Sequence, residues 1–172
     1  MFEKTKYLAV AFAVWIAALS NAACSTTTQQ HRANAAAVEE LGREALSLLS
    51  DEILCMKDRP MPEEAGPAYV LLNEGCIYYD SAQLIEAWKE HGRGAVLGVM
   101  AHELAHVIVR AAHSPSWESQ LVADNVAGCA LARANESAGG YISYLESLIG
   151  ANTPRMKLRT EATMRGVARC GG

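Results

Sequence analysis

Residues 94–109 of this chain are GAVLGVMAHELAHVIV. The stretch is apolar nearly all round, and with its flanks it predicts a buried helix from about Gly94 to Ala112. Three titratable side chains interrupt it, His102, Glu103 and His106, and burying them is costly unless they are paired or bind a metal ion. Because His102 and His106 are four residues apart, they share one helix face and can hold one metal ion between them.

The spacing H-E-x-x-H predicts a zinc site with peptidase chemistry. In this pattern the two histidines bind Zn²⁺, and Glu103 acts as the general base that activates a zinc-bound water. A catalytic zinc ion needs three protein ligands and one open position. A third ligand is therefore expected downstream of His106.

One candidate for the third ligand is His113. The longer motif H-E-x-x-H-x-x-G-x-x-H places its last histidine ten residues after the first, whereas His113 follows His102 by eleven. Val109 also stands where that motif has glycine. The alternative interpretation of His113 is an ordinary histidine at a helix end.

A later segment offers a better match. Residues 120–124 are Gln-Leu-Val-Ala-Asp, and Ala127-Gly128 follow. Together with the H-E-x-x-H helix, this segment resembles the gluzincin peptidases, specifically the minigluzincins and the family of the CAAX prenyl protease and the bacterial heat-shock membrane protease. In these, a later helix carries E-x-x-A-D, in which the Glu binds zinc and the Asp orients a zinc-bound His.

The resemblance implies that Gln120 is the third zinc ligand. It also implies that Asp124 orients a zinc-bound histidine by accepting a hydrogen bond from its other ring nitrogen. Gln120 departs from the family pattern, because a neutral amide oxygen is a weaker zinc ligand than a carboxylate. Glu118 or Asp124 itself could instead complete the site. Gln120 without any metal role, as a residue that bonds between helices, is a further alternative.

The same families often carry H-P-x-x-x-x-R after the third-ligand helix. Here Pro154 and Arg159 keep that spacing, and Thr153 replaces the His. The resemblance, which spans about residues 68–165, implies that Arg159 is a partner for an oxyanion or a substrate carboxylate; the alternative is a solvated arginine. Tyr141 and Tyr144 could face the cleft, although packing in the core is the competing interpretation.

The N-terminus indicates export. Residues 1–23 combine two lysines with an apolar run from Leu8 to Leu19, which is typical of a signal peptide. Ala22-Ala23-Cys24 resembles a lipoprotein cleavage site with Cys24 as the lipidated residue, although Asn21 stands where leucine is usual; cleavage by an ordinary signal peptidase is the alternative. We expect a bacterial periplasmic or envelope location.

Residues 24–34 are predicted to be a flexible tether, and residues 35–172 one domain. The net charge of −4 argues against nucleic acid as a partner. No second apolar stretch is long enough to cross a membrane, so membrane contact is expected only through an N-terminal lipid.

Four cysteines follow Cys24, and they allow three pairings. We expect disulfides Cys55–Cys76 and Cys129–Cys170, because each joins neighbouring segments. A cysteine metal site and free buried thiols are the alternatives.

The patterns predict a mostly α, zincin-like α+β fold with a small β element before the buried helix. The expected helices cover residues 35–54, 81–90, 115–134, 137–149 and 154–168, and the expected strands cover 68–72 and 76–79. Residues 55–67 are expected to form a loop. An exposed strand edge beside the metal could bind an extended peptide.

The sequence therefore predicts an exported zinc metallopeptidase that acts on a peptide or protein substrate. The alternative is a degenerate peptidase fold that no longer catalyses and binds a partner protein through the former substrate cleft. Retention of Glu103 favours the enzyme, and loss of the charged third ligand favours the binding protein.

Overall fold

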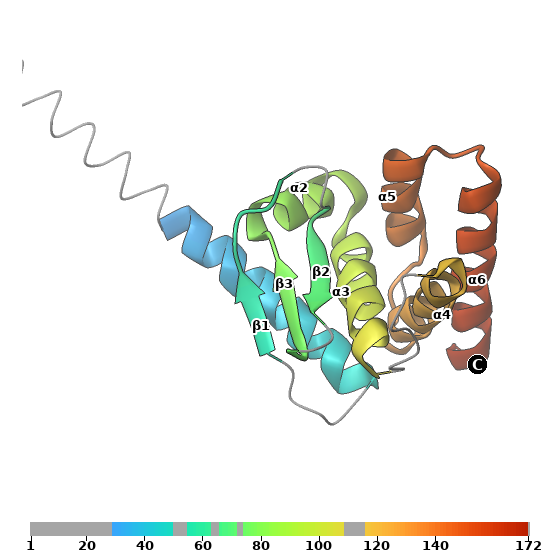
Figure 1. Cartoon of the computed structure of the whole chain (residues 1–172), viewed down its shortest axis with the longest axis horizontal. Helices are drawn as coiled ribbons and strands as arrows, with labels where there is room; N and C mark the ends of the chain where they lie inside the picture. Colours follow the sequence, from blue (N-terminus) through green and yellow to red (C-terminus); the bar gives the residue numbers. More distant parts are fainter. Residues whose placement is uncertain (1–28, 50–54, 63–65, 72–73, 109–115, 172) are drawn as a thin grey trace, which may run out of the picture. The chain divides into compact units, whose positions relative to one another are not determined.

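The computed structural model describes residues 29–49, 55–62, 66–71, 74–108 and 116–171 (Figure 1). The signal peptide, Cys24, His113 and Pro115 lie outside the described residues. The chain divides into two units, and the second, Ala35–Gly172, contains the site described below.

A helix over residues 29–49 precedes the labelled elements. These are, in order, β1 (Cys55–Asp58), β2 (Ala68–Leu71), β3 (Cys76–Tyr79), α2 (Ser81–His91), α3 (Arg93–Ile108), α4 (Trp117–Arg133), α5 (Gly139–Ile149) and α6 (Pro154–Cys170). The expected α+β class, mostly α with one small sheet, is confirmed.

The sheet has three strands in the order β1-β3-β2, with β1 parallel and β2 antiparallel to β3. Strand β3 is central and all four of its residues are buried. Strand β1 corrects the prediction of a loop over residues 55–67. It is short, half exposed and followed by prolines, so it exists through its pairing with β3 and not through a local pattern.

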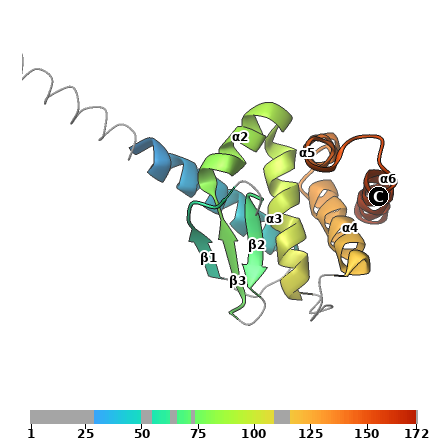
Figure 2. The same cartoon turned by 45° about the horizontal axis from the view of Figure 1, so that its top comes forward.

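Helix α3 lies between the sheet and the later helices (Figures 1 and 2). It packs against β2 on one side and against α4 and α5 on the other. Eleven of its residues, from Gly94 to Ala105, are buried, which confirms the prediction of a buried H-E-x-x-H helix. Its predicted end at Ala112 lies outside the described residues.

Most helix ends follow their sequence signals. The side chain of Asp80 accepts hydrogen bonds from the first turn of α2, and Gly92 ends that helix. Thr153 caps α6 ahead of Pro154. Helix α4 begins at Trp117 with Ser116 as its cap, two residues after the predicted start, because a serine hydroxyl at that position accepts from the amide of Ser119.

Two other helix starts differ from the predictions. Helix α5 begins at Gly139, two residues after the predicted start at residue 137. Residues 29–34, predicted to lie in the flexible tether, are helical. Alanine is the best helix former, and residues 33–37 contain four alanines, which carry the first helix into this stretch.

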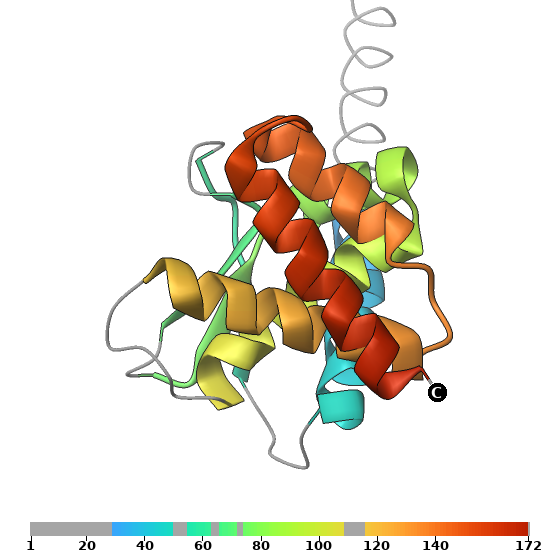
Figure 3. The same cartoon turned by 90° about the vertical axis from the view of Figure 1, so that its right-hand side faces the viewer.

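Helices α4 and α6 cross closely (Figure 3), and two glycines allow it. A Cβ atom on Gly128 would lie 2.0 Å from the carbonyl oxygen of Thr163, and one on Gly166 would lie 1.9 Å from that of Asn125. Any larger side chain would push the helices apart. This crossing brings Arg159 of α6 to Asp124 of α4.

Two disulfides are present, Cys55–Cys76 and Cys129–Cys170, as expected from the sequence. The first joins β1 to β3, and the second joins α4 to the end of α6. Disulfides persist in oxidising compartments, so both are consistent with an exported protein. Among the described residues, no helix is long and apolar enough to span a bilayer.

Candidate metal centre

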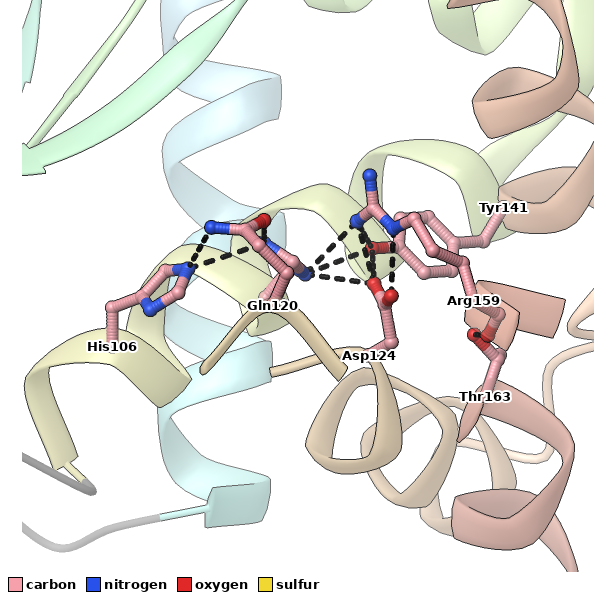
Figure 4. Close-up of polar contacts among 7 residues, drawn as sticks. His106, Gln120, Asp124, Tyr141, Arg159 and Thr163 are labelled. Carbon is pink, nitrogen blue, oxygen red and sulfur yellow. Dashed lines mark hydrogen bonds and ion pairs between the residues drawn. The ribbon is translucent and has the colours of Figure 1, made fainter. Parts of the chain in front are cut away.

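His102 and His106 of α3 come together with Gln120 of α4, and Figure 4 shows the side chains of His106 and Gln120 side by side. The Nε2 atoms of the two histidines are 3.2 Å apart. The Oε1 atom of Gln120 lies 3.1 Å from Nε2 of His102, and its Nε2 atom lies 3.4 Å from Nε2 of His106. Ligand atoms around tetrahedral zinc, at bonds of about 2.0–2.1 Å, are about 3.3 Å apart. The two distances between possible zinc donors are close to this spacing: 3.2 Å between the imidazole nitrogens, and 3.1 Å from Nε2 of His102 to Oε1 of Gln120.

The third donor is an amide and not a charged group. Within the described part of the chain, no three His, Cys, Asp or Glu side chains come together as a metal-binding group. Glu118, a candidate ligand from the sequence, is exposed on α4. The candidate donor groups here are thus the imidazoles of His102 and His106 and the carboxamide of Gln120. None of the three is a carboxylate or a thiolate.

Asp124 lies behind His102 and is completely buried. Its Oδ1 atom is 2.9 Å from Nδ1 of His102 and accepts a hydrogen bond of 2.8 Å from the hydroxyl of Tyr141. Arg159 donates from Nε to Oδ2 at 2.7 Å and from Nη2 to Oδ1 at 2.6 Å. Both oxygens of Asp124 are therefore engaged by Arg159, and Oδ1 also contacts His102 and Tyr141.

The charge of Asp124 is set by these partners. Burial, the largest influence, acts to raise the pKa of the Asp124 carboxyl. Hydrogen bonds from Arg159 and His102 outweigh it, so the pKa is lowered below the ordinary value. The ionised carboxylate can only accept hydrogen bonds, and Nδ1 of His102 must therefore carry a proton.

This proton assignment has a direct consequence for the metal centre. With Nδ1 of His102 protonated, its Nε2 atom holds the lone pair and faces His106 and Gln120. Burial, the largest influence, lowers the pKa of His106 to about 4. His106 is therefore neutral near pH 7, which is the form of histidine that binds zinc.

Glu103 lies beside the two histidines and next to strand β2. Burial raises the pKa of Glu103 to about 7, against the opposing effects of His102 and Arg159 and of a hydrogen bond with the backbone of Val70 in β2. A carboxylate with a pKa near the working pH is well suited to accept and return a proton.

A pocket of about 160 Å³ opens at this site. His102, Glu103, Gln120 and Arg159 form its polar side. Its apolar side comes from residues of α3, α5 and the start of β2, namely Val99, Leu145, Leu148 and Ala68. A cavity of about 150 Å³ is large enough for a benzene-sized group, so this pocket has room for one side chain of medium size.

The structure brings together most residues that the sequence singled out. His102, Glu103, His106, Gln120, Asp124 and Arg159 all lie at the site. Arg159 was predicted to be a partner for an oxyanion or a substrate carboxylate. Two of its nitrogens donate to Asp124, and its side chain also lines the pocket.

Tyr141 and Tyr144 were predicted either to face the cleft or to pack in the core. Both are buried and both line the pocket. The sequence did not predict the contact of the Tyr141 hydroxyl with Asp124, since this contact depends on where α5 lies against α3.

No family model, curated protein or solved structure matches this chain. The gluzincin resemblance therefore rests on the residues named above.

Proposed function

We propose that this protein is an exported zinc-dependent metallopeptidase of the bacterial cell envelope. One observation carries the proposal: Nε2 of His102 lies at zinc-ligand spacing from both Nε2 of His106 and Oε1 of Gln120, and Glu103 lines the same pocket as His102 and Gln120. A cation between the facing imidazole nitrogens would offset the cost of placing these polar groups in an apolar helix.

A bound zinc ion would supply Lewis acidity, polarising a substrate carbonyl and acidifying a water molecule. Glu103 would take the proton from the attacking water and return it to the leaving amine. Asp124 would hold His102 with Nε2 toward the metal. Arg159 would keep Asp124 ionised and in place, and its side chain is also near enough to the pocket to meet a substrate oxygen.

The surroundings of the site suit a peptide substrate. Strand β2 is at the edge of the sheet and lies beside α3, where an extended peptide could pair with it. The pocket would take one side chain next to the scissile bond. The proposal includes an N-terminal signal peptide, with Cys24 as the candidate lipid anchor, and the two disulfides support export.

The neutral third ligand favours one competing function. With Gln120 in place of a carboxylate, the metal would be held less tightly. The competing function is a non-catalytic envelope protein that binds a partner through the same cleft. Metal content and cleavage together separate the two functions.

The test uses purified protein, wild type and Glu103→Gln. Zinc per chain is measured by elemental mass spectrometry after dialysis, and cleavage is measured on a library of fluorogenic peptides. The peptidase predicts one zinc ion in both proteins and cleavage by the wild type only, because Glu103 is the base and not a ligand. Glu118→Gln, an exposed charge change on α4, is the matched control and should behave as the wild type.

Equal cleavage by wild type and Glu103→Gln would mean that another site is responsible. Folded wild-type protein with neither zinc nor cleavage would replace the peptidase with the non-catalytic binding protein.

A further inference from the structure

We infer that Tyr141 is a positioning residue, which orients the His102 ring so that its Nε2 atom faces the proposed metal. We also infer that Gly98 leaves the space that the Tyr141 ring occupies. This inference rests on the proposed function, because it assigns Tyr141 a role at the same site. Neither residue belongs to the H-E-x-x-H or Q-x-x-A-D patterns. The assignment comes from contacts among three helices, α3, α4 and α5.

The Tyr141 hydroxyl sits where three polar groups meet. It donates to Oδ1 of Asp124 at 2.8 Å and lies 3.1 Å from Nδ1 of His102. Nη2 of Arg159 donates to it at 3.4 Å. A phenolic oxygen has one proton to donate and two lone pairs to accept with. The hydroxyl proton goes to Oδ1 of Asp124, and Nδ1 of His102 lies within hydrogen-bond distance of both Asp124 and Tyr141, so its N–H is shared between them.

Sharing between two acceptors fixes the imidazole of His102 in two directions. Asp124 alone would leave the ring free to swing about a single hydrogen bond. Tyr141 adds a second acceptor from another helix, so the ring plane is held and Nε2 points toward His106 and Gln120. Groups that orient a ligand histidine in this way typically affect metal affinity about 10- to 100-fold.

Gly98 supports the same arrangement. It lies one turn before His102 on α3, and a Cβ atom there would be 2.5 Å from Cγ of Tyr141. No real side chain tolerates so short a contact, so the Tyr141 ring occupies the space that a larger residue would fill. Tyr141 is 1% exposed, so its ring is enclosed by neighbouring atoms. The position of its hydroxyl is thus determined by packing.

Tyr144 provides a matched control. It lies one turn after Tyr141 on α5, is 8% exposed and lines the same pocket. In the described part of the chain, no hydrogen bond joins its hydroxyl to Asp124 or His102. Removing the Tyr144 hydroxyl therefore tests burial and pocket lining without touching the network.

The experiment compares wild type, Tyr141→Phe and Tyr144→Phe. Zinc affinity is measured by competition with a chromophoric chelator, and the Nδ1 proton of His102 is followed by imidazole ¹⁵N–¹H NMR in metal-free protein. We expect Tyr141→Phe to weaken zinc binding on the order of tenfold. We also expect it to move the Nδ1–H resonance upfield and to speed its exchange with water. Tyr144→Phe should leave both unchanged.

Gly98→Ala gives an independent readout. Alone, it should weaken zinc binding, because it displaces the ring. In the Tyr141→Phe background it should lower stability but change zinc affinity little further, since the hydroxyl is already gone.

Wild-type zinc affinity together with an unchanged Nδ1–H resonance in Tyr141→Phe would overturn the inference and leave Tyr141 as a core residue. The NMR readout needs no metal, so it tests Tyr141 even if the wild type binds no zinc and the proposed function fails. Fully additive effects of Gly98→Ala and Tyr141→Phe on zinc affinity would likewise contradict the role given to Gly98.

Discussion

Arg159 donates hydrogen bonds to both carboxylate oxygens of Asp124, from Nε at 2.7 Å and from Nη2 at 2.6 Å. The pair joins α6 to α4 at a point where the carboxylate is completely buried. A buried carboxylate without a compensating charge is strongly disfavoured. Arg159 therefore stabilises the negative charge of Asp124 next to His102. Because a carboxylate only accepts hydrogen bonds, Nδ1 of His102 carries the proton between them.

Replacing Arg159 with Met should leave Asp124 buried without its cation. Removing one partner of a buried ion pair costs about 3–5 kcal/mol, so we expect a loss of this size in the free energy of unfolding, measured by urea titration. Arg155→Met, an exposed change on the same helix that removes a contact with Trp117, should cost less than about 1 kcal/mol. A double-mutant cycle with Asp124→Asn should show strong coupling, and additive costs would contradict the pairing.

Gln120→Glu should tighten zinc binding. A carboxylate adds a negative charge to two imidazoles, and Coulomb attraction then favours the dication. We expect zinc affinity, measured by chelator competition, to rise on the order of tenfold or more. Gln120→Ala should weaken it, and the exposed change Glu118→Gln should have no effect. If Gln120→Glu binds zinc no better than wild type, residue 120 is not a ligand.

Gly128→Ala should separate α4 from α6. The new methyl group would lie 2.0 Å from the carbonyl oxygen of Thr163, and such overpacking costs about 1–3 kcal/mol. Thermal unfolding measures this cost. Gly139→Ala is the control, because its Cβ meets only the flexible hydroxyl of Ser137 at 3.2 Å. It should be neutral or stabilising, and equal effects at the two glycines would count against the close crossing.

Asp124 should make the metal-free protein sensitive to acid. Burial acts to raise the pKa of Asp124, but hydrogen bonds from Arg159 and His102 lower it overall from the ordinary value of 3.8. A carboxyl whose pKa is lower in the folded state contributes stability that is present above its unfolded pKa. That stability is lost as the pH falls through the folded pKa.

The excess stability of wild type over Asp124→Asn should therefore be constant from about pH 7 to about pH 5 and shrink below about pH 4. Urea titrations of both proteins across this range, with chelator present, measure the difference. A difference that does not change with pH would show that the ionisation of Asp124 does not contribute to stability.

The sequence by itself determined the parts of this protein that depend on local spacing. Four-residue spacing put His102 and His106 on one helix face, and an apolar surround predicted that the helix is buried. Capping residues such as Asp80 and Thr153 marked helix starts within a few residues. Four cysteines in neighbouring segments were enough to indicate both disulfides.

Only the tertiary structure decided how distant segments meet. Strand β1 has no distinctive pattern of its own and forms because β3 lies beside it. Arg159 reaches Asp124 because Gly128 and Gly166 let two helices cross closely, and Tyr141 reaches His102 because Gly98 leaves space for its ring. Such contacts depend on the volumes and angles at which elements pack, and these are properties of pairs of segments that no spacing within one segment encodes.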